Sequence, residues 1–207
     1  MKHVPALALA VAIVPSSVLA QPAGERGGYT GASIGYARVY FSDNALFFPG
    51  ATSVSKDETD TAFRLYAGYR LHRHFALEGG WTRLGEFSFT RTVPSLGSAT
   101  GKFKASGWFA EAVGIVPLEK VSLFGKAGAI RYSAEKSLST TGSAAFAPGT
   151  DLNPKSTGVD WVLGAGAGYA FSNAWGARLD YDVYKVGDDK TGSFHVYVVS
   201  LGATYRF

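Results

Sequence analysis

The fold is decided by residues 161–184, WVLGAGAGYAFSNAWGARLDYDVY, in which large apolar residues alternate with small or polar ones. Before the turn residues 172–174, the apolar set is Trp161, Leu163, Ala165, Ala167, Tyr169 and Phe171, and the opposite set is Asp160, Val162, Gly164, Gly166 and Gly168. After the turn, the apolar set is Trp175, Ala177, Leu179, Tyr181 and Val183, and the opposite set is Gly176, Arg178, Asp180, Asp182 and Tyr184. Such period-two alternation predicts two strands with unlike faces, joined by a tight turn.

The same pattern recurs along most of the chain. Eight alternating segments are found, at 29–41, 61–71, 75–87, 102–116, 121–133, 157–171, 175–186 and 194–207. Short connections (72–74, 117–120, 172–174) alternate with polar and mostly long ones (42–60, 88–101, 134–156, 187–193). This order predicts an all-β, antiparallel up-and-down meander, and eight strands can close into a barrel that its own side chains just fill.

Two kinds of barrel fit this alternation, and they differ in which face points outward. A soluble ligand-binding barrel turns its apolar face inward, whereas a membrane barrel turns it outward. Aromatic residues near the ends of the apolar faces favour the membrane barrel, as interfacial girdles: Tyr36, Tyr40, Tyr69, Phe75, Trp81, Tyr169, Phe171, Tyr205 and Phe207. Glycines on the polar faces leave room in a narrow lumen: Gly31, Gly35, Gly68, Gly80, Gly128, Gly164, Gly166, Gly168 and Gly202. We therefore expect an eight-stranded transmembrane β-barrel with short periplasmic turns and long extracellular loops.

The inward register assigns ten charged residues to the lumen. They are Arg64, Arg70, Glu78, Glu111, Lys126, Asp160, Arg178, Asp180, Asp182 and Arg206, five basic and five acidic. Because an uncompensated buried charge is costly, these residues should pair as a lumen charge network. Arg83 and Arg131 fall on the outward register near the loop end, where their long side chains can reach the interface.

Composition excludes several other classes. The chain has no cysteine, which rules out disulfides, zinc–thiolate sites and cysteine catalysis. Its net charge of +4 is small and scattered, which gives no support for nucleic-acid binding. A short basic start, the apolar run VPALALAVAIV and the small-residue exit SSVLA predict a signal peptide at 1–20, with cleavage after Ala20. The barrel domain would then be residues 21–207.

Asp180 and Asp182 share an inward face as paired carboxylates would, but Arg178 and Lys126 on the same face favour charge pairing, which leaves the histidines as candidates for catalysis or metal binding. His72 and His74 lie in a short turn at the predicted periplasmic end and supply two metal ligands without a third. His195 lies at the opposite end, with Ser193, Asp188 and Asp189 nearby in sequence, as a hydrolase acting on lipid A would require. We expect no catalytic, cofactor or metal site, and keep a lipid A-modifying enzyme as the alternative.

Several short motifs together resemble one family. They are YTGASIG (29–35), GYRLHRHFALEGGWTRLG (68–85), KASG (104–107), TGV (157–159), GAGAGYAFSNAWGARLDY (164–181) and VSLGATYRF (199–207). Their order and spacing resemble the transmembrane domain of the outer membrane protein A (OmpA) family. The resemblance implies an eight-stranded outer-membrane barrel inserted by the barrel-assembly machinery. It also implies that Arg178 and Glu78 match interior residues of the family's ion-pair system, whereas Gly168 stands where a second family glutamate would lie.

The last strand resembles the terminal recognition signal of outer-membrane barrels. The pattern is polar, x, Gly, x, x, aromatic, x, aromatic, carried by Ser200, Gly202, Tyr205 and Phe207. We therefore expect a monomeric, non-enzymatic protein of a Gram-negative cell outer membrane, with a closed or narrowly permeable lumen. Its partners would be membrane lipid and lipopolysaccharide, and a host or surface ligand at the loops.

Overall fold

The computed structural model describes residues 26–39, 53–93, 97–142, 152–153, 155–187 and 194–207. Nine strands follow one another: β1 (Gly27–Val39), β2 (Ser53–Asp57), β3 (Thr59–His72), β4 (Phe75–Val93), β5 (Gly97–Leu118), β6 (Val121–Gly142), β7 (Lys155–Ala170), β8 (Trp175–Val186) and β9 (Phe194–Arg206). Within these residues, no helix has the length and apolar character needed to cross a membrane. The expected signal peptide at 1–20 and Tyr40 lie outside the described residues.

The strands close into a barrel, as predicted. Antiparallel neighbours run in the order β4, β3, β1, β9, β8, β7, β6 and β5, and β4 also pairs with β5. The short β2 pairs with β4 beside residues 88–92, directly beyond the stretch of β4 that pairs with β3. Because β2 and β3 are separated only by Glu58 and both pair with β4, they count as one interrupted strand, and the barrel has eight strands in all, the second along the chain being the interrupted one.

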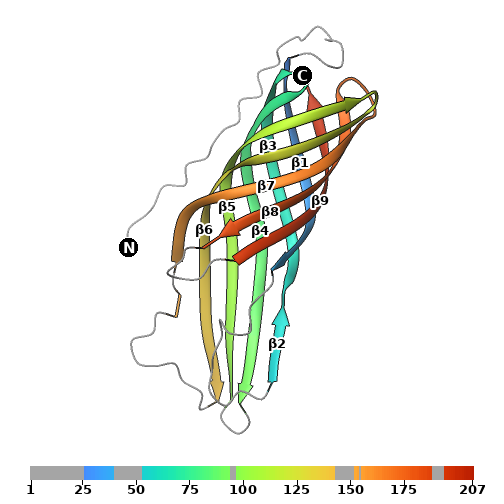
Figure 1. The fold of residues 1–207 in the computed structure, drawn as a ribbon. Coiled ribbons are helices and arrows are strands. Elements are labelled where there is room, and N and C mark those ends of the chain that lie inside the picture. Colours follow the sequence, from blue (N-terminus) through green and yellow to red (C-terminus); the bar gives the residue numbers. More distant parts are fainter. Residues whose placement is uncertain (1–25, 40–52, 94–96, 143–151, 154, 188–193) are drawn as a thin grey trace, which may run out of the picture.

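The short turns lie where the alternation placed them, but the strands at the other end run further than expected. β4 and β5 stay paired from Phe75↔Gly114 to Val93↔Gly97, and β5 pairs with β6 as far as Gly97↔Gly142. The predicted loop 88–101 is therefore wrong at residues 88–93 and 97–101, and the predicted loop 134–156 is wrong at residues 134–142, because these residues are strand. Hydroxyl pairs hold this polar sheet, including Thr90 with Thr100 at 3.0 Å. Figure 1 shows β4, β5 and β6, with β2, continuing past the ends of β8 and β9.

A bulge in β4 separates the barrel from this protruding sheet. The register with β5 shifts between Arg83 and Gly85, and Gly85 has a φ of 106°, a conformation that favours glycine. The Asp60 side chain of β3 accepts a hydrogen bond of 2.6 Å from the backbone N–H of Glu86. The extra residue changes which positions face inward, so Leu84 and Phe87 are both fully buried.

The outward face of the barrel is an apolar belt, which confirms the predicted sidedness. Ile34, Leu65, Leu163, Leu179 and Leu201 expose between 46% and 62% of their surface. Aromatic residues stand near the ends of the belt, including Trp175 and Tyr205, whose ring centroids are 4.9 Å apart. Large exposed apolar surface of this extent is unfavourable in water and favourable in a bilayer.

The interior has two layers, and one of them is less polar than expected. Toward the protruding sheet, an apolar cluster fills the barrel: Val39, Leu84, Phe87, Phe103, Ile130, Tyr132, Val162, Tyr184, Val186 and Val196. The buried charged residues lie next to this cluster, on the side of the short turns. The polar lumen predicted from the alternation is therefore confirmed for the layer nearer the short turns, while the layer nearer the protruding sheet packs as an ordinary hydrophobic core.

Candidate functional site: an ion-pair network inside the barrel

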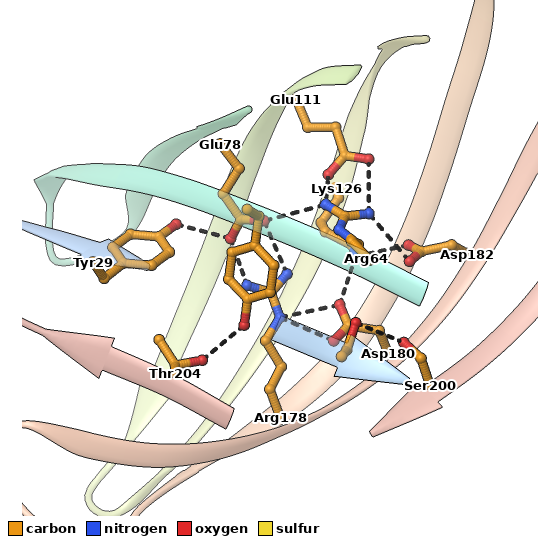
Figure 2. A network of polar contacts seen from close by, with 12 residues as sticks. Tyr29, Arg64, Glu78, Glu111, Lys126, Arg178, Asp180, Asp182, Ser200 and Thr204 are labelled. Carbon is orange, nitrogen blue, oxygen red and sulfur yellow. Dashed lines mark hydrogen bonds and ion pairs between the residues drawn. The ribbon is translucent and has the colours of Figure 1, made fainter. Parts of the chain in front are cut away.

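Five strands deliver seven charged side chains to one buried layer. They are Arg64 from β3, Glu78 from β4, Glu111 from β5, Lys126 from β6, and Arg178, Asp180 and Asp182 from β8. None exposes more than 7% of its surface. Figure 2 shows these side chains converging from opposite walls of the barrel. The period of two places Arg178, Asp180 and Asp182 on the same inward face.

Arg64 joins carboxylates from three strands. Its Nη2 atom lies 2.6 Å from Glu111 Oε2 and 3.4 Å from Glu78 Oε2. Its Nη1 atom lies 3.3 Å from Asp182 Oδ2 and donates a hydrogen bond of 3.0 Å to the Tyr184 hydroxyl. The guanidinium also stacks 3.8 Å from the centre of the Phe109 ring, a cation–π contact that shields it from water. Arg64 is thus the cation with the most carboxylate partners in the described network.

Arg178 makes the second centre of the network. Its Nη1 and Nη2 atoms hold Glu78 in a two-pronged pair, at 2.5 Å and 3.1 Å, and its Nε atom lies 3.0 Å from Asp180. The Tyr29 hydroxyl donates a further hydrogen bond of 2.8 Å to Glu78. The Phe124 ring covers the guanidinium at 4.3 Å. Bidentate arginine–carboxylate pairs are the more rigid kind, so this geometry fixes both side chains.

Lys126 connects the two centres. Its ammonium lies 2.5 Å from Asp180 and 2.7 Å from Asp182. The space for this contact exists because residue 164 on the neighbouring strand is a glycine: an added Cβ there would stand 2.0 Å from Asp182 Oδ1 and 2.9 Å from the lysine chain. The seven residues carry three cations and four carboxylates, a formal charge of −1. Every carboxylate in the set contacts at least one cation, so ion pairs connect the strands across the lumen and fill it at this level.

Three residues expected in the network lie apart from it. Asp160 pairs with Lys185 at 3.4 Å, where both side chains are partly exposed. Arg206, like Arg70, faces inward but is half-buried nearer the short-turn end, and makes no ion pair among the described residues. All three positions lie on the predicted face but at a different height along the barrel axis.

The four residues of the terminal pattern lie on both faces of β9. Ser200 is buried, 3.5 Å from the Ser33 hydroxyl, and Gly202 faces the same way. Tyr205 and Phe207 are exposed on the outward face, with ring centroids 6.4 Å apart. Their role as an assembly signal stays a prediction.

Several aromatic members of the site escaped the reasoning from sequence. Tyr29, Tyr66, Phe109 and Phe124 were not assigned to the lumen, although Tyr29 shares the register of Gly31, and Tyr66 that of Arg64. Tyr66 hydrogen-bonds Thr204 at 2.8 Å, past Gly31 of the intervening strand β1. Extending the inward register through each strand would have found all four.

The histidines lie outside the network. His195 is half-buried on the outward face of β9, 5.5 Å from the Trp161 ring and 6.4 Å from the Tyr197 ring. Ser193, Asp188 and Asp189 fall outside the described residues. The His74 backbone N–H donates to His72 Nδ1 at 3.4 Å, and the described ranges hold no cluster of three metal-ligating side chains.

Comparison with known proteins assigns this architecture. Residues 6–207 match the family described as outer membrane protein beta-barrel domain. Outer membrane protein A of Yersinia pseudotuberculosis is 28% identical over 207 residues, covering 98% of this chain and 55% of that protein, so the chain spans about half its length.

Solved structures share the fold. Neisserial surface protein A aligns with a TM-score of 0.54 at 16% identity, over 88% of this chain and 99% of that one. OprG of Pseudomonas aeruginosa aligns with a TM-score of 0.51 at 11% identity, over 89% and 98%. The chain is an integral protein of the cell outer membrane and belongs to the outer membrane protein β-barrel domain family.

Proposed function

We propose that this protein is a monomeric, non-enzymatic outer-membrane barrel that is closed to solutes and acts through its outward surface. The observation that carries the proposal is the filled lumen. A solute entering from the short-turn end meets the layer cross-linked by Arg64, Lys126 and Arg178, and then the apolar layer built around Leu84 and Phe87.

Passage of an ion would have to disrupt both layers. The charged layer is held by buried pairs, and separating one partner from such a pair costs about 3–5 kcal/mol. The apolar layer is built mostly from hydrocarbon side chains, which cannot replace the ion's hydration shell. Two barriers in series with opposite chemistry support a structural barrel over a diffusion pore.

The protruding sheet supports a role at the cell surface. β2 and the distal parts of β4, β5 and β6 extend beyond the barrel on the side opposite the short turns. Lys102, Ser137 and Ser139 are exposed there, so the sheet offers a rigid polar surface rather than a hydrophobic one. Extended sheets of this kind can recognise a partner through side-chain pairs or at a strand edge. A host or surface ligand would contact this sheet.

Conductance in planar lipid bilayers tests the closed lumen. We expect no stable channel steps for the wild type at neutral pH, and measurable steps when both layers are weakened in Arg178→Ala/Phe87→Ala. The matched control Lys155→Ala changes an exposed cation outside the lumen and should stay silent. Regular steps from the wild type would overturn the closed barrel.

The absence of enzymatic activity is tested separately. Mass spectra of lipid A should be identical in cells with and without the gene. A mass change that depends on the gene and is abolished by His195→Ala would replace the proposal with a lipid A-modifying enzyme.

A further inference from the structure

Two inward-facing arginines of the barrel stand apart from the ion-pair network. Arg70 lies near the end of β3 and Arg206 at the end of β9, and β1 runs between these strands, with Gly27 opposite Arg70 and Tyr29 opposite Arg206. Both arginines are half-buried at the short-turn end. Strands are spaced about 4.8 Å apart and residues about 3.4 Å, so two strands and two residues separate their Cα atoms by roughly 12 Å. The two guanidinium groups therefore face the same mouth of the lumen.

The charges of Arg70 and Arg206 are not balanced within the described part of the chain. Neither side chain forms an ion pair with a described residue, and Arg206 is close enough to Arg70 for their like charges to repel. The Tyr29 hydroxyl donates its hydrogen bond to Glu78, which is itself paired with Arg178 (Figure 2). Because partly buried charges without a counter-charge are unfavourable, an anion at this mouth would stabilise both arginines.

The space between the two arginines is open because residue 27 is a glycine. Gly27 shares the inward register of Tyr29. Among the described atoms, a Cβ added to Gly27 would meet only the backbone oxygen of Phe207, at 3.5 Å, which is an ordinary contact. Position 27 therefore leaves room for a small ion between Arg70 and Arg206.

The surface around this mouth is also basic. The described residues of the short turns and the adjoining start of β1 add the cations Arg26, Arg73 and Lys120 and one acid, Glu119. Arg26 is held there by a hydrogen bond of 3.1 Å from its Nε atom to the backbone oxygen of Leu71. A surface with an excess of one charge raises the local concentration of ions of the opposite charge. Dissolved anions are therefore attracted to the short-turn end of the barrel.

We propose that Arg70 and Arg206 bind a phosphate group, either as free phosphate or as the phosphomonoester of a small solute, at the periplasmic mouth of the lumen. Guanidinium groups bind phosphate oxygens in a bidentate manner. A phosphomonoester carries about −1.5 to −2 charges at neutral pH, which two arginines balance, whereas a carboxylate would balance only one of them. Both side chains face the lumen instead of the apolar belt, so the site takes a dissolved solute in preference to a membrane lipid. The site lies on the periplasmic side of both closed layers, so it does not depend on whether the lumen conducts.

Phosphorus NMR of the protein in maltoside micelles tests the site, with inorganic phosphate and glycerol phosphate as probes and acetate as a competitor. Arg70→Gln/Arg206→Gln should weaken binding of the phosphate probes at least about tenfold, since each arginine–phosphate pair contributes a charge-assisted hydrogen bond. Gly27→Val keeps both charges but fills the space between them, so it should weaken binding as well. The control Arg73→Gln/Lys120→Gln removes the same charge from the same end of the barrel and should retain the wild-type affinity.

Each outcome decides the proposal. If the wild type bound neither phosphate probe, the site would be overturned without any variant, even if a variant failed to fold. An equal loss in the control pair would mean diffuse attraction to a basic surface and would also overturn the site. Displacement of phosphate by an equal concentration of acetate would overturn phosphate as the ligand chemistry. Binding of both probes would support a site that accepts phosphomonoesters, and binding of inorganic phosphate alone would support a site for the free ion. Heat-dependent migration on SDS gels would establish that each variant is folded.

Discussion

Arg64→Met would remove the cation that joins three carboxylates within the barrel. Arg64 is 4% exposed and contacts Glu78, Glu111 and Asp182. Methionine retains a long unbranched chain, so little packing volume is lost. Glu111 loses its shortest ionic partner, and breaking one partner of a buried pair costs about 3–5 kcal/mol. We therefore expect the free energy of unfolding to fall by about that amount.

A surface pair provides the matched comparison. Lys155 and Glu135 form an ion pair at 2.7 Å, but their side chains are 69% and 52% exposed. Such pairs contribute about 0–1 kcal/mol, so Lys155→Met should change stability by less than about 1 kcal/mol.

Reversible urea unfolding of the protein in lipid vesicles, followed by tryptophan fluorescence, would measure both variants. Adding a second substitution, Glu111→Gln, to Arg64→Met should restore part of the lost free energy of unfolding, because it removes the carboxylate charge that Arg64→Met leaves unpaired. An Arg64→Met variant that costs no more than Lys155→Met would refute the reasoning that pairing holds the buried charges. A double variant less stable than the single one would also contradict it.

Three further outcomes follow from the geometry. Gly164→Ala should destabilise the barrel by about 1–3 kcal/mol in the same urea assay, because its Cβ would displace Asp182, whereas Gly125→Ala meets nothing within 4 Å and should be close to neutral. Phe87→Ala should cost about 3–5 kcal/mol and leave a cavity in the apolar layer, which a smaller loss would contradict. Carboxyl NMR should give Glu86 a pKa below that of an ordinary glutamate, and Lys104→Gln should raise that pKa. The stabilisation that the pairing with Lys104 contributes is fully present at pH values above the ordinary glutamate pKa, and it is lost as the pH falls through the pKa of folded Glu86.

The outward direction of the apolar face could be predicted from the sequence because period-two alternation allows only two arrangements, with the apolar face outward or inward. A register slip of one residue would move every side chain to the other face. The twelve residues of β8 show both faces: its outward positions are apolar, and its inward positions include Arg178, Asp180 and Asp182. The short turns followed for the same reason: alternation stops at residues 72–74, 117–120 and 172–174, and the structure turns there.

The protruding sheet could not be predicted in this way. Residues 88–101 and 134–142 are rich in serine, threonine and glycine, which favour turns in isolation. Residues 88–93, 97–101 and 134–142 form strands because the adjoining parts of β4, β5 and β6 already lie side by side, so the pairing continues into them. The bulge at Gly85 was hidden for a related reason, since one extra residue inverts the faces without changing composition.

The members of the charge network could be named only by face. Alternation predicts that Asp160 and Asp180 both point inward, but not their height along the barrel. Height depends on the stagger between strands, which places Asp180 beside Lys126 and Asp160 beside Lys185.

Spin labels at two adjacent positions of β9 test the central claim most directly, and the chain's lack of cysteine makes single-site labelling simple. Leu201 is 62% exposed on the outward face, and Ser200 is 4% exposed on the inward face. In lipid vesicles, a label at Leu201 should be accessible to oxygen and protected from a water-soluble nickel chelate, while a label at Ser200 should be protected from both. A Leu201 label open to the chelate would contradict the outward apolar belt, and a Ser200 label open to it would contradict the filled lumen.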